Sequence, residues 1–364
     1  MYRTTSGEEI FVIDSHTHLW DGSPENQKNK YGKGWIECFY DYHRNLSPPD
    51  YVWPLEKYQK YGVETMVNDE FVKGYVDVAI LQPTYLKEFY INGFNTIEQN
   101  NVVKQAYPDR FILNGRWDPR EGEKGLEELR RQKAEYNIQG VKLYTAEWYG
   151  NSKGYKLSDP EAYRFLEESV KLDIRNIHVH KGPTIFPLNK DAFDVADIDD
   201  AATQFTELNF IVEHVGLPRL EDFCWIATQE SNVYAGLSVA MPFIYPRPHY
   251  FAEIMANLLY WIGPDKILFG SDYAIWEPKW LIERFLSFEL PEDIQREFNV
   301  KLDMETKRKI LGLNAARLYD VTPEERMRKL QKDDFSQRAR ALYPVGLGTG
   351  AGSGATMAPT SVDV

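Results

Sequence analysis

The sequence is poor in cysteine, in long apolar runs and in clustered basic residues. Its two cysteines among 364 residues, Cys38 and Cys224, lie far apart without C-x-x-C spacing, which excludes a disulfide scaffold and a cysteine-based zinc cluster. No stretch reaches the roughly 18 consecutive apolar residues of a membrane span. The opening segment MYRTTSGEEI lacks the apolar run and basic flank of a signal peptide. We therefore expect a soluble, cytoplasmic protein with reduced thiols and no membrane association.

The charge balance is acidic. There are 42 Lys and Arg residues against 55 Asp and Glu residues, which gives a formal net charge of -13, and no run of five basic residues occurs. Such a surface repels phosphate backbones instead of neutralising them. We expect a small-molecule substrate and no nucleic-acid partner.

Short apolar runs, bounded by turn residues, alternate with amphipathic stretches. Eight runs predict strands, at 10–18, 76–82, 110–115, 138–144, 175–180, 209–214, 233–239 and 267–272. Some, such as VDVAIL and NFIVEH, are apolar almost throughout, as in strands of a parallel sheet that is covered on both faces. Helices are predicted between them at 125–136, 160–172, 199–206 and 251–262. The alternation predicts a (β/α)8 TIM barrel, with a doubly wound open sheet as the second choice.

Three regions depart from this alternation within an expected single domain, 1–342. Residues 21–61 form a long insertion after the first strand that contains nine aromatic residues. It is either a packed excursion that buries its own rings or a lid or surface for a protein partner. Residues 278–320 are expected to be helices that close the barrel. The Gly-rich segment 343–364 predicts a flexible tail.

Five of the seven histidines fall near the carboxyl ends of predicted strands: His16, His18, His178, His180 and His214. Strand residues i and i+2 share a face, and active sites of barrels assemble at the carboxyl ends of the strands. Asp272 ends the eighth strand, which adjoins the first in a closed barrel. Imidazoles and a carboxylate are ligands of zinc and similar divalent ions, and a bound ion activates water at neutral pH. A hydrogen-bonded core imidazole is the alternative for each histidine taken alone.

Several runs then match a family in order along the chain: VIDSHTHLW, HKGP, EHVG, GSDY and NAARLYDV. They resemble the amidohydrolase superfamily, and most closely its amidohydrolase-2 branch of aminocarboxymuconate semialdehyde decarboxylase-like decarboxylases and C–O or C–N hydrolases. The resemblance extends from about residue 10 to 321 and implies a (β/α)8 barrel with one divalent ion, usually Zn²⁺, with Mn²⁺ or Fe²⁺ as alternatives. It implies the ligands His16, His18, His180 and Asp272, and makes His214 the unliganded acid/base.

The roles of several other residues stay open. His180 is preferred to His178 as a ligand because it stands last on its strand, and the reverse assignment stays open. Asp14 is a candidate acceptor for a ring proton of a ligand. Lys142 is either a barrel lysine that contacts substrate or, as in other branches of the superfamily, a carbamylated bridge between two metals.

Residues around the expected site suggest the substrate. Arg116 and Arg247 at the rim suit a substrate carboxylate or, equally, a surface ion pair. Trp276 and other aromatic residues in the rim loops favour a small aromatic or apolar substrate.

Three functions are compatible with these residues. The first is hydrolysis of a lactone, ester or amide by metal-activated water, with Asp272 accepting the water's proton and His214 assisting the leaving group. The second is non-oxidative decarboxylation of an unsaturated or phenolic acid at the same site. The third is a non-catalytic accessory or assembly protein that docks through the 21–61 insertion. We further expect a homo-oligomer.

Overall fold

The structure is a computed structural model that describes residues 2–4 and 7–343. Within these residues eight strands form one parallel sheet in the order β10-β9-β8-β7-β6-β5-β4-β3, and two short strands pair near the N-terminus. The strands are β1 Tyr2–Arg3, β2 Glu9–Ile10, β3 Ile13–Thr17, β4 Val78–Leu81, β5 Phe111–Gly115, β6 Gly140–Leu143, β7 Asn176–His180, β8 Asn209–Glu213, β9 Val233–Gly236 and β10 Ile267–Leu268.

The helices follow the strands in the manner of a barrel. They are α1 Lys30–Leu46, α2 Leu55–Gln59, α3 Val63–Val67, α4 Ile97–Ala106, α5 Gly122–Tyr136, α6 Pro160–Lys171, α7 Asp197–Gln204, α8 Leu220–Gln229, α9 Pro248–Trp261, α10 Pro278–Ser287, α11 Glu292–Phe298, α12 Met304–Arg308, α13 Asn314–Leu318, α14 Pro323–Leu330 and α15 Asp334–Leu342. The short 3₁₀ segments are η1 Pro24–Asn26, η2 Pro49–Tyr51, η4 Pro119–Glu121, η5 Lys190–Phe193, η6 His214–Gly216, η7 Ser238–Ile244 and η8 Pro264–Lys266, and η3 Asn68–Lys73 and η9 Lys309–Leu313 are π-helical.

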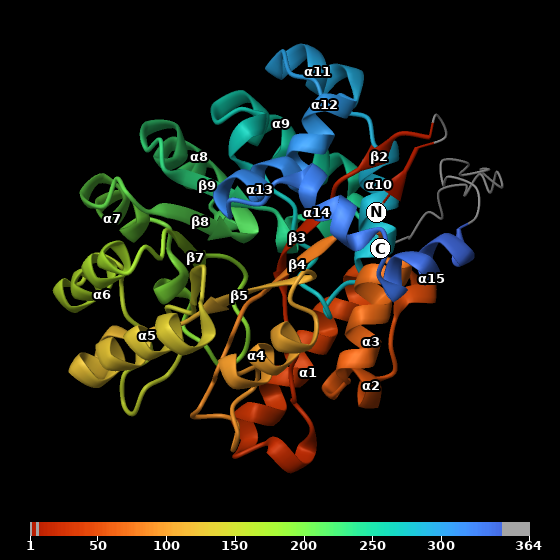
Figure 1. Ribbon diagram of the computed structural model, residues 1–364. Coiled ribbons are helices and arrows are strands. Elements are labelled where there is room, and N and C mark those ends of the chain that lie inside the picture. Colours follow the sequence, from red (N-terminus) through yellow and green to blue (C-terminus); the bar gives the residue numbers. More distant parts are fainter. Residues whose placement is uncertain (1, 5–6, 344–364) are drawn as a thin grey trace, which may run out of the picture.

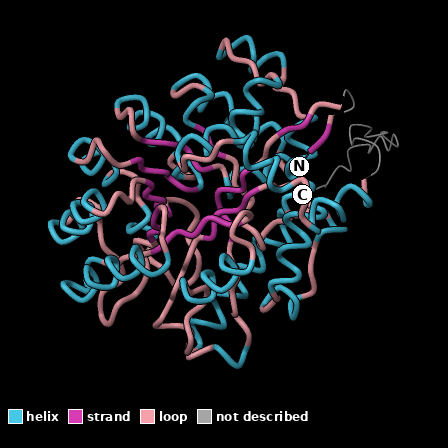
Figure 2. The backbone as a smooth tube through the Cα atoms, in the orientation of Figure 1, coloured by secondary structure: helices cyan, strands magenta, loops and turns pink. Residues whose placement is uncertain are grey.

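The predicted (β/α)8 barrel is confirmed. The strands occupy the centre of the molecule and helices surround them (Figures 1 and 2). The first and last strands meet where Ser15 N–H donates to Phe269 O (3.1 Å) and His18 N–H donates to Tyr273 O (2.7 Å). These bonds bring the segment that follows β10 beside β3, and with it Asp272 beside the paired histidines.

All eight predicted strands are present, and most end within a few residues of the expected positions. Their central residues are buried on both faces, which explains why the runs are apolar without alternation. β10 is much shorter than predicted, because Phe269 N–H donates to Ile310 O instead of to a neighbouring strand (2.9 Å). The chain then turns at Asp272, whose φ of 58° lies in the left-handed region.

The 21–61 insertion packs as a small helical layer on the barrel. Its rings of Trp35, Phe39, Trp53 and Tyr58 are all buried, and Trp20 lies against Phe39 at a centroid distance of 5.2 Å. Burial of these rings agrees with a packed excursion, while Tyr31, Tyr40, Tyr42 and Tyr51 are only partly buried, and the role of the insertion as a lid or partner surface stays a prediction. Two glycines of α1 allow close packing: a Cβ on Gly32 would lie 2.5 Å from the backbone oxygen of Phe89, and one on Gly34 would lie 2.4 Å from the ring of Phe186.

The remaining features agree with the sequence where they can be compared. The helices predicted for 278–320 are present as α10–α13, and Cys38 and Cys224 are both free thiols. None of the helices in the described ranges is long and apolar enough to cross a membrane. The predicted tail, 343–364, lies outside the described residues except for Tyr343.

Candidate metal centre

The backbone presents the candidate side chains at the carboxyl ends of four strands. His16 lies on β3 and His18 directly follows it, His180 ends β7, His214 directly follows β8, and Asp272 lies four residues beyond β10. His214 and Asp272 have left-handed backbones, with φ of 64° and 58°. Such conformations cost of order 1–3 kcal/mol and cluster at functional sites. The strain is one reason to look for function at these two positions.

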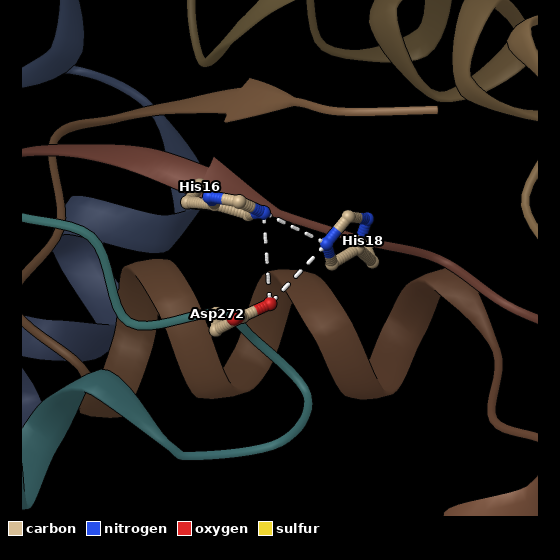
Figure 3. Close-up of side chains that lie close together, drawn as sticks. All are labelled: His16, His18 and Asp272. Atoms are coloured by element: carbon tan, nitrogen blue, oxygen red, sulfur yellow. Dashed lines mark hydrogen bonds and ion pairs between the residues drawn. The ribbon is translucent and has the colours of Figure 1, made fainter. Parts of the chain in front are cut away.

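His16, His18 and Asp272 form one buried cluster (Figure 3). Nε2 of His16 lies 3.0 Å from Nε2 of His18, and Oδ1 of Asp272 lies 3.6 Å from the first and 3.2 Å from the second. A tetrahedral zinc ion with bonds of about 2.0–2.1 Å holds its ligand atoms about 3.3 Å apart. The spacing of these three atoms therefore fits a common divalent ion.

The hydrogen bonds behind the two rings set their tautomers. Nδ1 of His16 lies 2.9 Å from the Glu213 carboxylate, and Nδ1 of His18 lies 2.6 Å from the carbonyl oxygen of Gln82. Because both partners accept hydrogen bonds, each ring holds its proton at Nδ1 and turns the lone pair of Nε2 toward the cluster. Three acceptor atoms thus face one another, an arrangement that a cation stabilises.

His180 and His214 lie next to each other beside this cluster. Nε2 of His214 is 2.9 Å from Nδ1 of His180, and the His16 and His214 ring centroids are 5.4 Å apart. The backbone N–H of Val239 donates to Nδ1 of His214 (3.3 Å), so the neutral ring holds its proton at Nε2. His180 is not among the three residues of the compact cluster, and its role as a fourth ligand stays a prediction.

A second polar group lies beneath the cluster, formed by His178 and its partners. Nδ1 of His178 is 2.5 Å from Glu213 Oε1 and Nε2 is 2.7 Å from the Tyr319 hydroxyl. Tyr319 also bonds to Asn114, whose side-chain amide donates to Gln82. Both ring nitrogens of His178 are therefore occupied within the barrel.

Burial and the mixed charges shape the protonation of the cluster. Burial lowers the pKa of His16 to about 4 and that of His214 to about 3, which keeps these imidazoles neutral and able to bind a cation at neutral pH. Burial alone would raise the pKa of Asp272, but the surrounding His16, His18 and His214 hold it well below its usual range. Asp272 is therefore an anion in this site.

Lys142 approaches the cluster from inside the barrel. Its Nζ lies 3.1 Å from Nε2 of His16, and burial lowers its pKa. Glu213 and Asp272 are the anions that act on it. Its side chain is nearly inaccessible, with 2% exposed, and it is not one of the described residues that line the cavity.

A cavity opens over the cluster, and the space free of protein atoms there, part of it open solvent, amounts to about 490 Å³. Trp276 lines it, whereas the structure places Arg116 and Arg247 elsewhere. Arg116 is paired with Glu121 (3.2 Å), and the exposed Arg247 lies over the ring of Tyr250. Besides the four histidines and Asp272, the lining residues are Trp35, Phe39, Tyr42, Thr84, Phe94, Tyr144, Pro183, Ile185, Val239, Ile275 and Trp276.

Sequence reasoning missed two groups that hold the cluster in place. Glu213 stands in the EHVG run and is the lone charged residue of an apolar strand, a signal that could have marked it. Gln82 acts through its backbone carbonyl, for which no sequence signal exists. Asp14 does not accept a ring proton; its carboxylate accepts the backbone N–H groups of His16 (3.1 Å) and Ser271 (2.9 Å).

A family model described as Amidohydrolase matches residues 13–321, nearly the whole of the described barrel. No match is found among the curated proteins. The matched residues include the cluster, the two further histidines and the segment that closes the barrel.

Solved structures share the fold at low sequence identity. An uncharacterized TIM-barrel protein from Bordetella bronchiseptica is 17% identical with a TM-score of 0.62, over 86% of this chain and 99% of that one. A probable 2-pyrone-4,6-dicarboxylic acid hydrolase from Acinetobacter baumannii is 14% identical (TM-score 0.52; 85% and 99% covered). A 5-carboxyvanillate decarboxylase from Novosphingobium aromaticivorans, with bound manganese, is 15% identical (TM-score 0.52; 88% and 100% covered). Hydrolases and decarboxylases thus both occur on this barrel.

Proposed function

The chain belongs to the amidohydrolase family, and from this premise we propose that it is a metal-dependent hydrolase of a C–O or C–N bond in a small aromatic or apolar substrate. The observation that supports it is the buried group of His16, His18 and Asp272 beneath an apolar cavity. We propose His180 as the further ligand. Zn²⁺ suits this mixture of imidazole and carboxylate, with Mn²⁺ or Fe²⁺ as alternatives.

Each residue has a task in this proposal. A divalent ion bound there would polarise a substrate carbonyl and lower the pKa of a water molecule toward about 7. The Asp272 carboxylate, whose pKa lies well below its usual range, would accept the proton of that water. His214 holds its proton at Nε2, directed at Nδ1 of His180 (2.9 Å), and would turn this proton to the developing oxyanion or the leaving group. The aromatic walls exclude bulk water, which strengthens these interactions.

The absence of lysine and arginine from the described lining residues favours hydrolysis over decarboxylation. Neither Arg116 nor Arg247 is among the described residues that line the cavity, so no guanidinium there holds a substrate carboxylate. Decarboxylation is the second candidate. Its support is the apolar wall, because a carboxylate that loses its hydration is destabilised relative to neutral carbon dioxide. In that reaction His214 would deliver a proton to the substrate carbon.

The test combines elemental analysis with two assays on the purified protein. We expect close to one equivalent of a divalent ion, lost in His18→Ala, and hydrolysis of an aryl lactone such as dihydrocoumarin. His214→Ala should keep the ion and lose most turnover. Arg247→Ala, at an exposed position outside the cavity, is the control. It should change neither the metal content nor the turnover.

Other results would contradict the proposal. Release of carbon dioxide from 2-hydroxybenzoate without lactone hydrolysis would favour the second candidate. A stable protein that contains no metal and captures another protein through the 21–61 insertion would favour the accessory role.

A further inference from the structure

Four residues that line the cavity carry a polar atom with no partner in the described chain: Nε1 of Trp35, Oγ1 of Thr84, the hydroxyl of Tyr144 and Nε1 of Trp276. All four side chains are buried, with exposed fractions between 0% and 8%. The large majority of buried polar side-chain atoms in proteins are hydrogen-bonded, and each exception calls for a cause. Unpartnered buried atoms also occur elsewhere, for example on Tyr155 and Trp280, but these four belong to residues of one cavity and can share a partner that enters it.

The four residues come from segments far apart in the sequence. Trp35 lies on α1, Thr84 follows β4, Tyr144 follows β6 and Trp276 follows β10. Two of them are linked to the metal centre through their rings: the Trp35 and Tyr144 centroids are 5.9 Å apart, and those of Tyr144 and His180 are 4.4 Å apart. A ligand held by these donors therefore lies beside the imidazoles.

The charge of the lining limits what the cavity accepts. No lysine or arginine occurs among its described lining residues, and Asp272 is the single carboxylate. A bound divalent ion can balance one anionic group of a ligand. A second carboxylate would lose its hydration among aromatic walls without a cationic partner, which costs several kcal/mol. Arg116 is paired with Glu121, and Lys142, whose Nζ lies 3.1 Å from Nε2 of His16, reaches the cluster from inside the barrel without lining the cavity.

We propose that the cavity selects ring-bearing substrates with at most one negative charge, and that Trp35, Thr84, Tyr144 and Trp276 orient them through neutral hydrogen bonds to carbonyl or hydroxyl oxygens. This inference rests on the proposed function for the position of the reacting bond. The indole N–H groups are donors only, while the two hydroxyls both donate and accept. The substrate therefore presents oxygen acceptors around its ring, and aromatic stacking supplies the remaining contact.

The test measures binding instead of turnover. Salicylamide, salicylate and 4-hydroxyisophthalate share a hydroxylated ring and carry about zero, one and two negative charges at neutral pH. Their affinities for the metal-loaded protein are measured by calorimetry at constant ionic strength. We expect salicylamide and salicylate to bind and 4-hydroxyisophthalate to bind at least about 10-fold more weakly, the equivalent of about 1.4 kcal/mol.

Single-atom variants then test the donors. Tyr144→Phe and Thr84→Val should each weaken salicylamide binding by about 3- to 10-fold, because each removes one hydrogen bond. Neither should lower the melting temperature, since the hydroxyl that is removed has no partner in the protein. Tyr155→Phe is the matched control: Tyr155 also has a buried, unpartnered hydroxyl but does not line the cavity, so binding should not change.

The outcomes separate this inference from the proposed function. Selective binding that depends on Tyr144, together with no hydrolysis, would contradict the proposed function and support the selectivity. Equal binding of the doubly charged probe, failure of all three probes to bind, or unchanged affinity in Tyr144→Phe and Thr84→Val would overturn the selectivity, whatever the activity. The last result would mean that ordered water satisfies these donors.

Discussion

His178 and His180 lie two residues apart on the same strand, and their surroundings differ completely. We call the first region the floor, made of Gln82, Asn114, His178, Glu213 and Tyr319. The second is the mouth, made of His16, His18, His180, His214 and Asp272. In the floor both nitrogens of His178 have protein partners at 2.5 and 2.7 Å. In the mouth, lone pairs of two histidines and an aspartate oxygen face one another.

The difference teaches that the kind of partner, and not residue type, separates the two histidines: His178 is held by a carboxylate and a phenol inside the barrel, whereas His180 contacts His214 (2.9 Å) and the backbone oxygen of Pro183 (3.3 Å). A saturated buried network adds rigidity and leaves no atom for a ligand. The acceptor atoms of the mouth are stabilised by a cation or a donated proton, and Nζ of Lys142 already lies 3.1 Å from one of them, Nε2 of His16. Glu213 belongs to both regions, because one carboxylate oxygen binds His178 and the other binds His16.

The largest effect is expected from Glu213→Gln, which acts on both regions at once. This change removes the buried anion that pairs with His16 and His178 and that acts on Lys142. Breaking a buried ion pair costs about 3–5 kcal/mol of stability. Loss of an acceptor behind a metal ligand lowers metal affinity by about 10- to 100-fold. Urea unfolding and metal titration measure the two effects. Glu253→Gln, on the exposed face of α9, is the control and should change neither the stability nor the metal affinity. An intact metal affinity in Glu213→Gln would contradict the link between floor and mouth.

An intermediate effect is expected when the two histidines of β7 are replaced in parallel. His178→Asn should lower the free energy of unfolding of the metal-free protein by about 1–3 kcal/mol, because Tyr319 and Glu213 lose a buried partner. His180→Asn should lower that stability less and should weaken metal binding as well, because its ring bonds only to His214 and to the Pro183 carbonyl oxygen. The measurements are urea unfolding without metal and metal titration of each variant. If His178→Asn lost the ion and His180→Asn kept it, the assignment of floor and mouth would be reversed.

The smallest effect is expected from an ion pair outside both regions. Arg110 binds Asp333 through two bonds of 2.7 and 2.9 Å. Burial alone would raise the Asp333 pKa, but the Arg110 guanidinium holds it below its ordinary value of about 3.9. Its stabilising contribution is therefore present above about pH 4 and is lost as the pH falls through the folded-state pKa.

Solvent screening limits that contribution to about 1 kcal/mol. The stability difference between the wild-type protein and Asp333→Asn should shrink as the pH falls from 6 to 3, with metal content equal at neutral pH. A difference that stayed constant with pH would show that Asp333 acts through packing instead of charge.

The sequence predicted the barrel well because its signal is local. A strand that is covered on both faces is apolar along most of its length, as in VDVAIL and NFIVEH. This pattern is visible in the sequence without knowing which strands lie next to it. The helical ranges are likewise predicted to within a few residues. β10 ended early because its backbone bonds to Ile310 instead of a strand, and that partner is a tertiary neighbour.

The rim arginines show where local reasoning stops. Arg116 follows β5 at the expected end of the barrel, yet its guanidinium turns to Glu121 and lies over the ring of Tyr85. Nothing in the order of residues distinguishes this from a group that faces the cavity. Its proposed contact with substrate, like that of Arg247, Lys142 and Trp276, depends on side-chain direction.

By itself the sequence determined the alternation of strands and helices and the placement of metal-binding residue types at strand ends, because both follow from spacing along the chain. The tertiary structure alone decided that Glu213 joins His16 to His178 and that four neutral donors around the cavity lack partners. The reason is physical: a hydrogen bond forms or fails over a few tenths of an ångström between atoms from remote segments, and only the closed ring of strands sets those distances.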